Sequence, residues 1–414
     1  MSTWNNPPHG GLLRTRPNDG KEPRRIFDED RSLFPEHRDG RPDIDLESGK
    51  FLKVWQGPQH PGITGNMSLE LTVNGDEVVE CKTHVGYLHR GFEKLMERRL
   101  YIQNFPLVCR ICVPEPDFNE YLYAACVEDL AGIEVPEKAS WLRLLTLEMA
   151  RLTSFLMWIG GQAGSLGMGT IGQWAVTHRD YMLDLFEELS GGRIYHMYII
   201  PGGVRDDLPE GWHEHAADVL SKIEKLLGEI ELVMLNNAVL KSRLKGLGHI
   251  DAEMVDHYGI TGPNARASGV ARDIRKDHPY LGYDELDFDV VTRTEGDAYA
   301  RLEVRLAEMY QAVDLIRQII GKIPATGPIH TKLPNVLHWK IPPGQTWHRA
   351  ECTRGEYGYM MVADGTDKPR RVYVRGPSYT HAMAVMEDMA VNTNIADIAG
   401  LMVSLHTYPP EVER

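Results

Sequence analysis

The chain has 414 residues, 42% of them apolar, and a formal net charge of −14. This length fits one large domain or roughly two to three smaller ones, each with a sizeable core. The excess of acidic residues argues against a nucleic-acid-binding surface and favours protein partners with basic patches. The five cysteines, an odd and small number, argue against a disulfide-stabilised secreted protein and indicate a reducing compartment.

The N-terminus and the apolar runs of the sequence argue against a secretory signal peptide and against a membrane-spanning helix. The first residues have no apolar core of the signal type. No run of about 18 apolar residues occurs, so we expect that the chain does not span a membrane by itself.

Residues 1–50 are rich in Pro, Gly, Arg and Asp and have few large apolar groups. A segment of this composition does not bury enough surface to fold alone. It is therefore either a disordered tail or an extended arm that lies over a partner subunit.

Residues 51–90 form a predicted N-terminal β-hairpin region. Alternating runs at 67–73 and 77–80 flank Asn74-Gly75, a dipeptide typical of hairpin turns. A small antiparallel sheet is thus expected before the first helix.

From 91 to 330 the apolar residues recur with the period of a helix, which predicts a helical bundle. Pro136 indicates the start of one helix, and Gly160-Gly161 indicates its end. The expected helices cover 92–101, 118–130, 138–159, 178–189, 213–240 and 296–323.

Residues 331–414 form a predicted C-terminal hairpin and tail. Strand-like runs at 354–363 and 370–375 are separated by Asp364-Gly365, and a short helix is expected at 380–390. This second hairpin could pair with the N-terminal sheet. The predicted fold class is α+β, mainly a helical bundle with a small antiparallel β part formed by the two hairpins.

The densest group of reactive side chains lies between two of the expected helices. Cys109 and Cys112 form a C-x-x-C pair around Arg110, close to Glu115 and Asp117. A structural zinc needs about four ligands, and a thioredoxin-like motif needs a βαβ setting. A buried structural pair is therefore the competing interpretation. His60 and the His89-Arg90 pair are polar groups at element edges, either functional or simply solvated.

Several motifs follow one another in a recognisable order. They are Gly57-Pro-Gln-His-Pro61, Gly86-Tyr-Leu-His-Arg-Gly-Phe-Glu-Lys94, Gly132-Ile-Glu-Val-Pro136, Pro201-Gly-Gly-Val204, Gly259-Ile-Thr-Gly-Pro263, Arg354-Gly-Glu-Tyr-Gly358 and Glu411-Val-Glu-Arg414. With them the chain, from Gly57 to Arg414, resembles the 49-kilodalton-type (D-type) subunit of respiratory complex I, a relative of nickel-iron hydrogenase large subunits.

The resemblance implies an architecture and partners. It implies a hydrogenase large-subunit-like fold, peripheral on the cytoplasmic face of the cell membrane, within a membrane complex. The implied partners are a B-type iron-sulfur subunit, C-type and I-type peripheral subunits and an H-type membrane subunit, with no nucleic acid. The chain itself is expected to bind no redox cofactor. The last iron-sulfur cluster belongs to the neighbouring subunit, and a quinone or other lipid-soluble acceptor binds in the shared cleft.

The chain departs from the hydrogenase pattern at the metal. Hydrogenases hold nickel with four thiolates, which suit nickel and iron chemistry. Here Cys112 keeps one of these positions, while Glu115, Tyr408 and Glu411 occupy the other three. We therefore expect no nickel-iron centre and no metal site.

The chain also departs from quinone-reducing complex I. In that family a Tyr and a His, the His leaning on an acid, donate to the quinone headgroup. Here Val113, Thr64 and Ser165 stand at those three positions, which we expect to contact substrate. The cavity therefore holds either a different acceptor or the same acceptor protonated differently. Nearby groups that can take over are Cys112, Glu115 and Asp117 for protons, with His60 and His89 for orientation; we expect His60, Cys112 and Glu115 to be catalytic.

Other positions bear on the neighbouring cluster. Arg90 matches a family arginine whose positive charge raises the reduction potential of the cluster, and Arg110 is expected to act similarly. A family histidine is replaced by Phe155, and His196 precedes Pro201 where some members carry a histidine.

The resemblance thus implies an oxidoreductase subunit, active only within a membrane-bound, ion-translocating complex similar to NADH:quinone oxidoreductase. Two alternatives stay open. One is a subunit of a hydrogenase-related complex without nickel-iron that reduces a non-quinone acceptor such as a sulfur species. The other is a structural subunit that only couples its partners.

Overall fold

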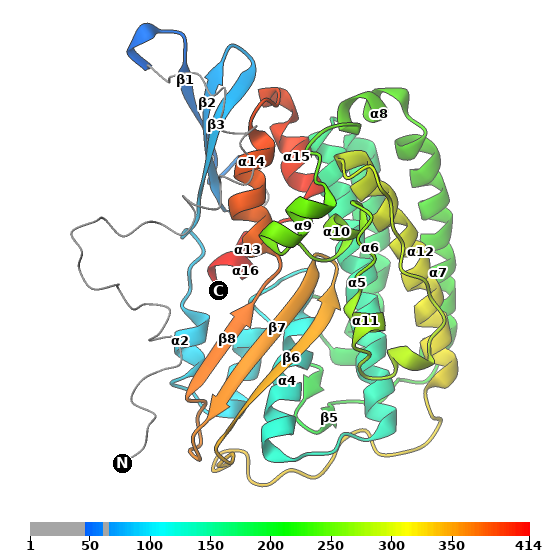
Figure 1. Ribbon diagram of the computed structural model, residues 1–414. Helices are drawn as coiled ribbons and strands as arrows, with labels where there is room; N and C mark the ends of the chain where they lie inside the picture. Colours follow the sequence, from blue (N-terminus) through cyan, green and yellow to red (C-terminus); the bar gives the residue numbers. More distant parts are fainter. Residues whose placement is uncertain (1–45, 61–65) are drawn as a thin grey trace, which may run out of the picture.

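Long helices lying side by side form the body of the molecule, as the computed structural model shows (Figure 1). The structure describes residues 46–60 and 66–414. The long helices are α4 (Pro116–Ala131), α5 (Glu137–Ser165), α6 (Gly169–Ser190), α7 (Trp212–Ile230) and α12 (Ala298–Lys322). Helix α5 is the central one, because it packs against α4, α6 and α12 and buries residues on all of its sides. None of the helices in the described ranges combines the length and apolar character needed to cross a bilayer.

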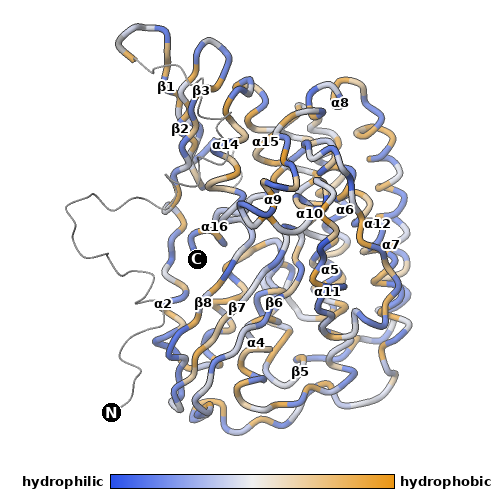
Figure 2. Tube along the Cα trace, in the orientation of Figure 1, coloured by the Kyte–Doolittle hydropathy of each residue, from blue (hydrophilic) through white to orange (hydrophobic). Residues whose placement is uncertain are grey.

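The outer helices follow the predicted amphipathic pattern. Along α7 the buried residues recur three or four positions apart, from Trp212 through Val219 and Ile223 to Ile230. Figure 2 shows hydrophobic and hydrophilic residues alternating along this helix. The apolar face packs on α6 and α12, while the polar face lies outside.

The predicted stop at Gly160-Gly161 is wrong, because α5 continues to Ser165. The glycines serve helix packing instead. A Cβ on Gly172 of α6 would lie 3.1 Å from the carbonyl oxygen of Gly160, so the two backbones approach closely. A pattern that normally ends a helix here permits a tight α5–α6 contact.

Three other predicted helix boundaries also differ. The run at 213–240 is divided into α7 and α8 (Ala238–Leu244), and α8 is capped by the Asn237 side chain. The run at 92–101 is helical only in α2 (Phe92–Met96), and α6 begins nine residues before 178. The remaining helices are short: α3 (Phe105–Val108), α9 (Ala252–Tyr258), α10 (Pro263–Arg266), α11 (Ile274–Asp277), α13 (Ser378–Thr380), α14 (Met386–Ala390), α15 (Ile398–Ser404) and α16 (Pro409–Glu413).

In the described part of the chain, three separate antiparallel sheets accompany the helices. The first has the order β1 (Leu52–Gln56), β2 (Ser68–Asn74), β3 (Glu77–His84); the second pairs β4 (Ile199–Ile200) with β5 (Gly203–Val204). The third has the order β6 (Gly344–Cys352), β7 (Gly355–Ala363), β8 (Arg371–Arg375). Both predicted hairpins therefore form, but β6 extends the second one on its N-terminal side.

The N-terminal and C-terminal hairpins, which could have paired, lie in separate sheets. The edge of β3 is covered by the segment after α14, where the Val78 amide donates to the Thr393 carbonyl at 2.9 Å. On the same side, the Glu387 carboxylate accepts hydrogen bonds from the backbone and hydroxyl of Thr83. The N-terminal sheet therefore projects away from the bundle beside α14 and α15 (Figure 1).

A buried ion network fixes the third sheet against the bundle. Arg266 of α10 lies 2.8 Å from Glu308 of α12 and 2.7 Å from Glu351 of β6. All three side chains are buried, so removing one leaves the others as uncompensated charges. This network holds the turn between β6 and β7 at the front of the bundle, where the candidate site lies.

The four-part division of the chain at 50, 90 and 330 stays a prediction.

Candidate functional site at the front of the bundle

The side chains at the hydrogenase ligand positions surround a buried arginine. Arg354 lies in the two-residue turn between β6 and β7. Its guanidinium lies 2.7 Å from Glu115, 3.1 Å from Glu411 and 2.8 Å from the Cys112 sulfur. The ring of Tyr408 lies 5.5 Å from the guanidinium carbon. The residues at the four hydrogenase ligand positions therefore do meet in space, but around the guanidinium of Arg354 and not around a metal.

These residues do not fit a nickel-iron centre. They offer one thiol and two carboxylates, and the guanidinium of Arg354 fills the space between them. Within the described ranges, no group of three or more His, Cys, Asp and Glu side chains is arranged to hold a metal ion. Soft metals need a thiolate-rich donor set, which this cluster lacks.

Burial sets the protonation of the cluster. It raises the pKa of the Cys112 thiol well above its usual range, against the opposing effect of Arg354. It also raises the pKa of Glu411, again opposed by Arg354. Cys112 is therefore a neutral thiol at physiological pH, with its sulfur accepting from the guanidinium. The C-x-x-C pair is not a disulfide, since both cysteines are free and buried.

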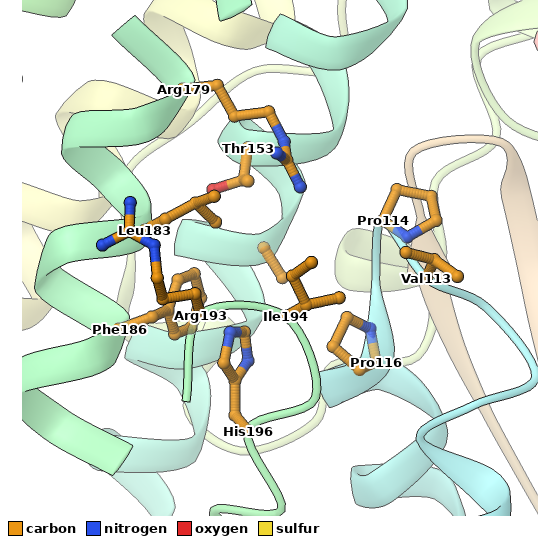
Figure 3. Close-up of a pocket in the computed structure, with 11 residues that line it drawn as sticks. Val113, Pro114, Pro116, Thr153, Arg179, Leu183, Phe186, Arg193, Ile194 and His196 are labelled. Carbon is orange, nitrogen blue, oxygen red and sulfur yellow. The ribbon is translucent and has the colours of Figure 1, made fainter. Parts of the chain in front are cut away.

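Next to this cluster lies a small pocket of about 10 Å³, the space of roughly one water molecule. One wall is the loop that contains Val113 and Pro114, and another is the segment that ends at His196 (Figure 3). The start of α4 and helices α5 and α6 supply the rest. The lining residues are mostly apolar, with a few polar groups among them: Val113, Pro114, Pro116, Ala150, Thr153, Arg179, Leu183, Phe186, Arg193, Ile194 and His196.

The local sequence explains how the loop 110–115, called the front loop below, reaches the pocket wall. Pro116 occupies the first turn of α4, where its missing N–H costs nothing and its fixed φ favours a helix start. The loop before it is anchored by Glu115, whose carboxylate accepts from the Thr353 amide at 3.0 Å and from Arg354. Val113 is thereby held, half-buried, at the pocket wall.

The structure brings together only part of the predicted site. Cys112 and Glu115 meet at Arg354, and Val113 lines the adjacent pocket. Thr64 lies outside the described residues. Ser165, near the end of α5, donates its hydroxyl back to the Gln162 carbonyl at 2.9 Å and is not among the described residues that line the pocket.

The remaining predicted residues lie around this front. His60 is an exposed residue at the end of the described segment 46–60. Arg110 stacks on the ring of Tyr195 at 4.7 Å. Arg90 is exposed, with its guanidinium 4.3 Å from the centre of the Phe92 ring. The catalytic, substrate-binding and cluster-tuning roles of these residues stay predictions.

Sequence reasoning missed the role of Arg354. A signal for it existed, because two carboxylates at buried former ligand positions require a nearby positive charge. The arginine itself could not be chosen without β6, whose end places the turn residue beside the front loop.

Comparisons with known proteins agree with this architecture. The family model of the respiratory-chain NADH dehydrogenase 49 kDa subunit matches residues 165–339 and 335–414. The D-type subunit of NADH-quinone oxidoreductase from Thermosipho melanesiensis is 44% identical over 365 residues, covering 88% of this chain and 99% of that protein. The chain belongs to this family.

Two further relatives carry the names of other redox enzymes. The D-type subunit of F(420)H(2) dehydrogenase from Methanosarcina mazei is 38% identical over 375 residues, 89% of this chain and 99% of that protein. A chain in the structure of the membrane-bound sulfane sulfur reductase (MBS), an archaeal respiratory membrane complex, is 42% identical with a TM-score of 0.87. That match covers 90% of this chain and 100% of the other.

These findings confirm several expectations. The chain is a complex I D-type subunit from a divergent branch, of the oxidoreductase class, with the predicted α+β fold. Its relatives belong to multi-subunit membrane complexes.

Proposed function

We propose that this chain is the D-type core subunit of a membrane-bound, ion-translocating oxidoreductase complex. Electrons arrive from the last iron-sulfur cluster of an adjacent B-type subunit. They pass to a lipid-soluble acceptor of the quinone class in the cleft between the two subunits. C-type and I-type peripheral subunits and an H-type membrane subunit complete the surroundings at the cytoplasmic face of the membrane.

The pocket beside Val113 carries this proposal. Its walls are mostly apolar with a few polar groups, the usual lining of a site for an organic molecule. At about 10 Å³ its free space in this chain is far smaller than the pockets of roughly 300 Å³ or more that hold drug-sized ligands. The pocket therefore forms only one wall of the acceptor site, and the facing subunit has to enclose the headgroup.

A sulfur acceptor is the second candidate. The relative from the sulfane sulfur reductase complex is 42% identical over 100% of its length, close to the 44% of the quinone-named relative. In addition, Val113 supplies no hydroxyl where the quinone-reducing family has a tyrosine. A small polysulfide needs less room and fewer donors than a quinone ring.

The test uses the purified intact complex with its clusters chemically reduced. Mixing with a short-chain quinone or with polysulfide is followed by stopped-flow absorbance of the clusters. Fast reoxidation by quinone supports the first candidate, and reoxidation by polysulfide alone supports the second. If neither acceptor reoxidises the clusters of an otherwise intact complex, the redox proposal is wrong and a purely coupling role remains.

A further inference from the structure

A buried histidine–aspartate pair lies at the wall of the pocket. The Nδ1 atom of His196 lies 3.0 and 3.1 Å from the two carboxylate oxygens of Asp117. Only 4% of His196 and none of Asp117 is exposed. The two residues are 79 positions apart in sequence, so the fold alone brings them together.

The imidazole ring is held in one orientation. It stacks on Phe186 with 3.8 Å between ring centroids and 6° between planes. The backbone just after it is fixed by Glu120, whose carboxylate accepts from the amides of Met197, Tyr198 and Ile199 at 2.8 to 3.1 Å. Met197 has a φ of +45°, a conformation that is uncommon outside glycine and often found at functional sites.

The other ring nitrogen, Nε2 of His196, is buried and has no hydrogen-bond partner among the residues that the structure describes. Buried polar atoms in proteins are almost always paired, so an exception indicates a missing ligand or a functional role. His196 lines the same pocket as Val113, and its ring is drawn among the pocket residues in Figure 3. With Asp117 fixing a proton on Nδ1, Nε2 is the atom free to exchange a proton with a bound molecule.

The charges around this histidine come from several elements. Carboxylates favour the imidazolium form and guanidinium groups oppose it. The neighbouring charged or titratable groups are Asp117 and Glu120 on α4, Arg179 on α6, Arg193 and Tyr195 in its own segment, and Cys109 and Arg110 in the front segment. Asp117 is the group in direct contact.

We propose that His196 donates a proton to the acceptor in this pocket and that Asp117 is its positioning residue. This inference rests on the proposed function. The acceptor takes two electrons from the neighbouring cluster. At one quinone oxygen the Nε2–H bond breaks and an O–H bond forms, leaving a neutral imidazole, while water supplies the second proton at the other oxygen. His196 thus supplies a proton donor in place of the tyrosine hydroxyl that is absent at Val113.

The experiment measures quinone-driven reoxidation of pre-reduced clusters in the intact complex, from about pH 5 to pH 8. The variants are His196→Gln and Asp117→Asn. His215→Gln is the matched control, since His215 also pairs with a carboxylate, Glu188 at 2.9 Å, but on the exposed surface of α7. Cluster content and complex size are checked for each variant.

His196→Gln is expected to slow reoxidation by about 100-fold, the usual contribution of a positioned acid, and to flatten its pH dependence. Asp117→Asn is expected to shift the alkaline fall in rate to lower pH, because the imidazolium loses the carboxylate that stabilises it. His215→Gln leaves both rate and profile unchanged. Should His196→Gln not assemble, the shift in Asp117→Asn decides the matter.

A wild-type rate and pH profile in His196→Gln overturns this inference while leaving the proposed function intact. An unshifted profile in Asp117→Asn removes the positioning role. If the wild-type complex itself is not reoxidised by quinone, the proposed function fails and the inference fails with it, so the two failures are distinguishable.

Discussion

Replacing Arg354 by methionine should destabilise the front of the molecule strongly. The guanidinium contacts Glu115 at 2.7 Å and Glu411 at 3.1 Å, and all three side chains are buried. Its removal leaves two carboxylates without a counter-charge. Breaking a buried pair in this way costs about 3 to 5 kcal/mol. At about 1.4 kcal/mol per factor of ten, local opening should become at least about 100-fold more frequent.

Hydrogen–deuterium exchange of the β6–β7 hairpin in the intact complex measures this opening. Arg349→Met on β6 is the control, because its ion pair with Glu356 is 3.6 Å long and its side chain is 33% exposed. Such a pair contributes about 0 to 1 kcal/mol. Adding Glu115→Gln and Glu411→Gln to the Arg354 variant should restore part of the protection, since no buried charge then remains.

The effect should also depend on pH. Burial already raises the pKa of Glu411 while Arg354 opposes the shift, so loss of the arginine raises that pKa further. The variant should therefore take up a proton, and its exchange defect should shrink as the pH falls. Equal protection of the hairpin in Arg354→Met and Arg349→Met would refute the view that this arginine holds the site.

Three further predictions concern other parts of the fold. Burial lowers the pKa of His381 to about 3, so only the unfolded chain binds this proton below about pH 6.5. Acid unfolding should therefore show about 2 kcal/mol of lost stability between pH 7 and pH 5 that His381→Gln removes; identical curves would contradict this. Gly262 has a φ of +73°, and a Cβ would lie 2.4 Å from the hairpin backbone, so Gly262→Ala should lower the melting temperature by an equivalent of about 1 to 3 kcal/mol. Gly321→Ala, in open space on α12, should be neutral or slightly stabilising, and equal effects would argue against the clash. Burial raises the pKa of Cys109 to about 12, and Cys112 is fully buried, so peptide mass spectrometry should find neither labelled by a thiol reagent until the protein is denatured. Labelling of either cysteine in the native complex would show that the front is open.

Much of the fold follows from local pattern, and its exceptions have physical causes. The buried stripe of α7 is readable from the period of its apolar residues, and the turn between β2 and β3 from Asn74-Gly75. The predicted end of α5 is wrong because Gly160 packs against α6, and packing decides the matter over a local stop signal. Strand β6 is absent from the predicted elements although it fixes Arg354.

The candidate site is less readable from sequence than the fold. Cys112 and Glu115 are identifiable from sequence because they belong to one continuous motif, Arg110 to Glu115. Asp117 and His196 come from segments 79 residues apart, and no local spacing connects them. Their pairing depends on how α4 packs against the segment before β4, which only the tertiary structure supplies.

The decisive question for the proposed function is whether the acceptor reaches the pocket beside Val113. Val113→Trp fills that half-buried position with a large ring, whereas Val239→Trp, at a site on α8 that is 69% exposed, is the matched control. Quinone-driven reoxidation of the pre-reduced clusters is then compared in the two complexes. We predict that Val113→Trp slows reoxidation by about tenfold or more with clusters intact, because the acceptor is displaced from its reacting position. A Val113→Trp complex that reoxidises as fast as the Val239→Trp complex would contradict it.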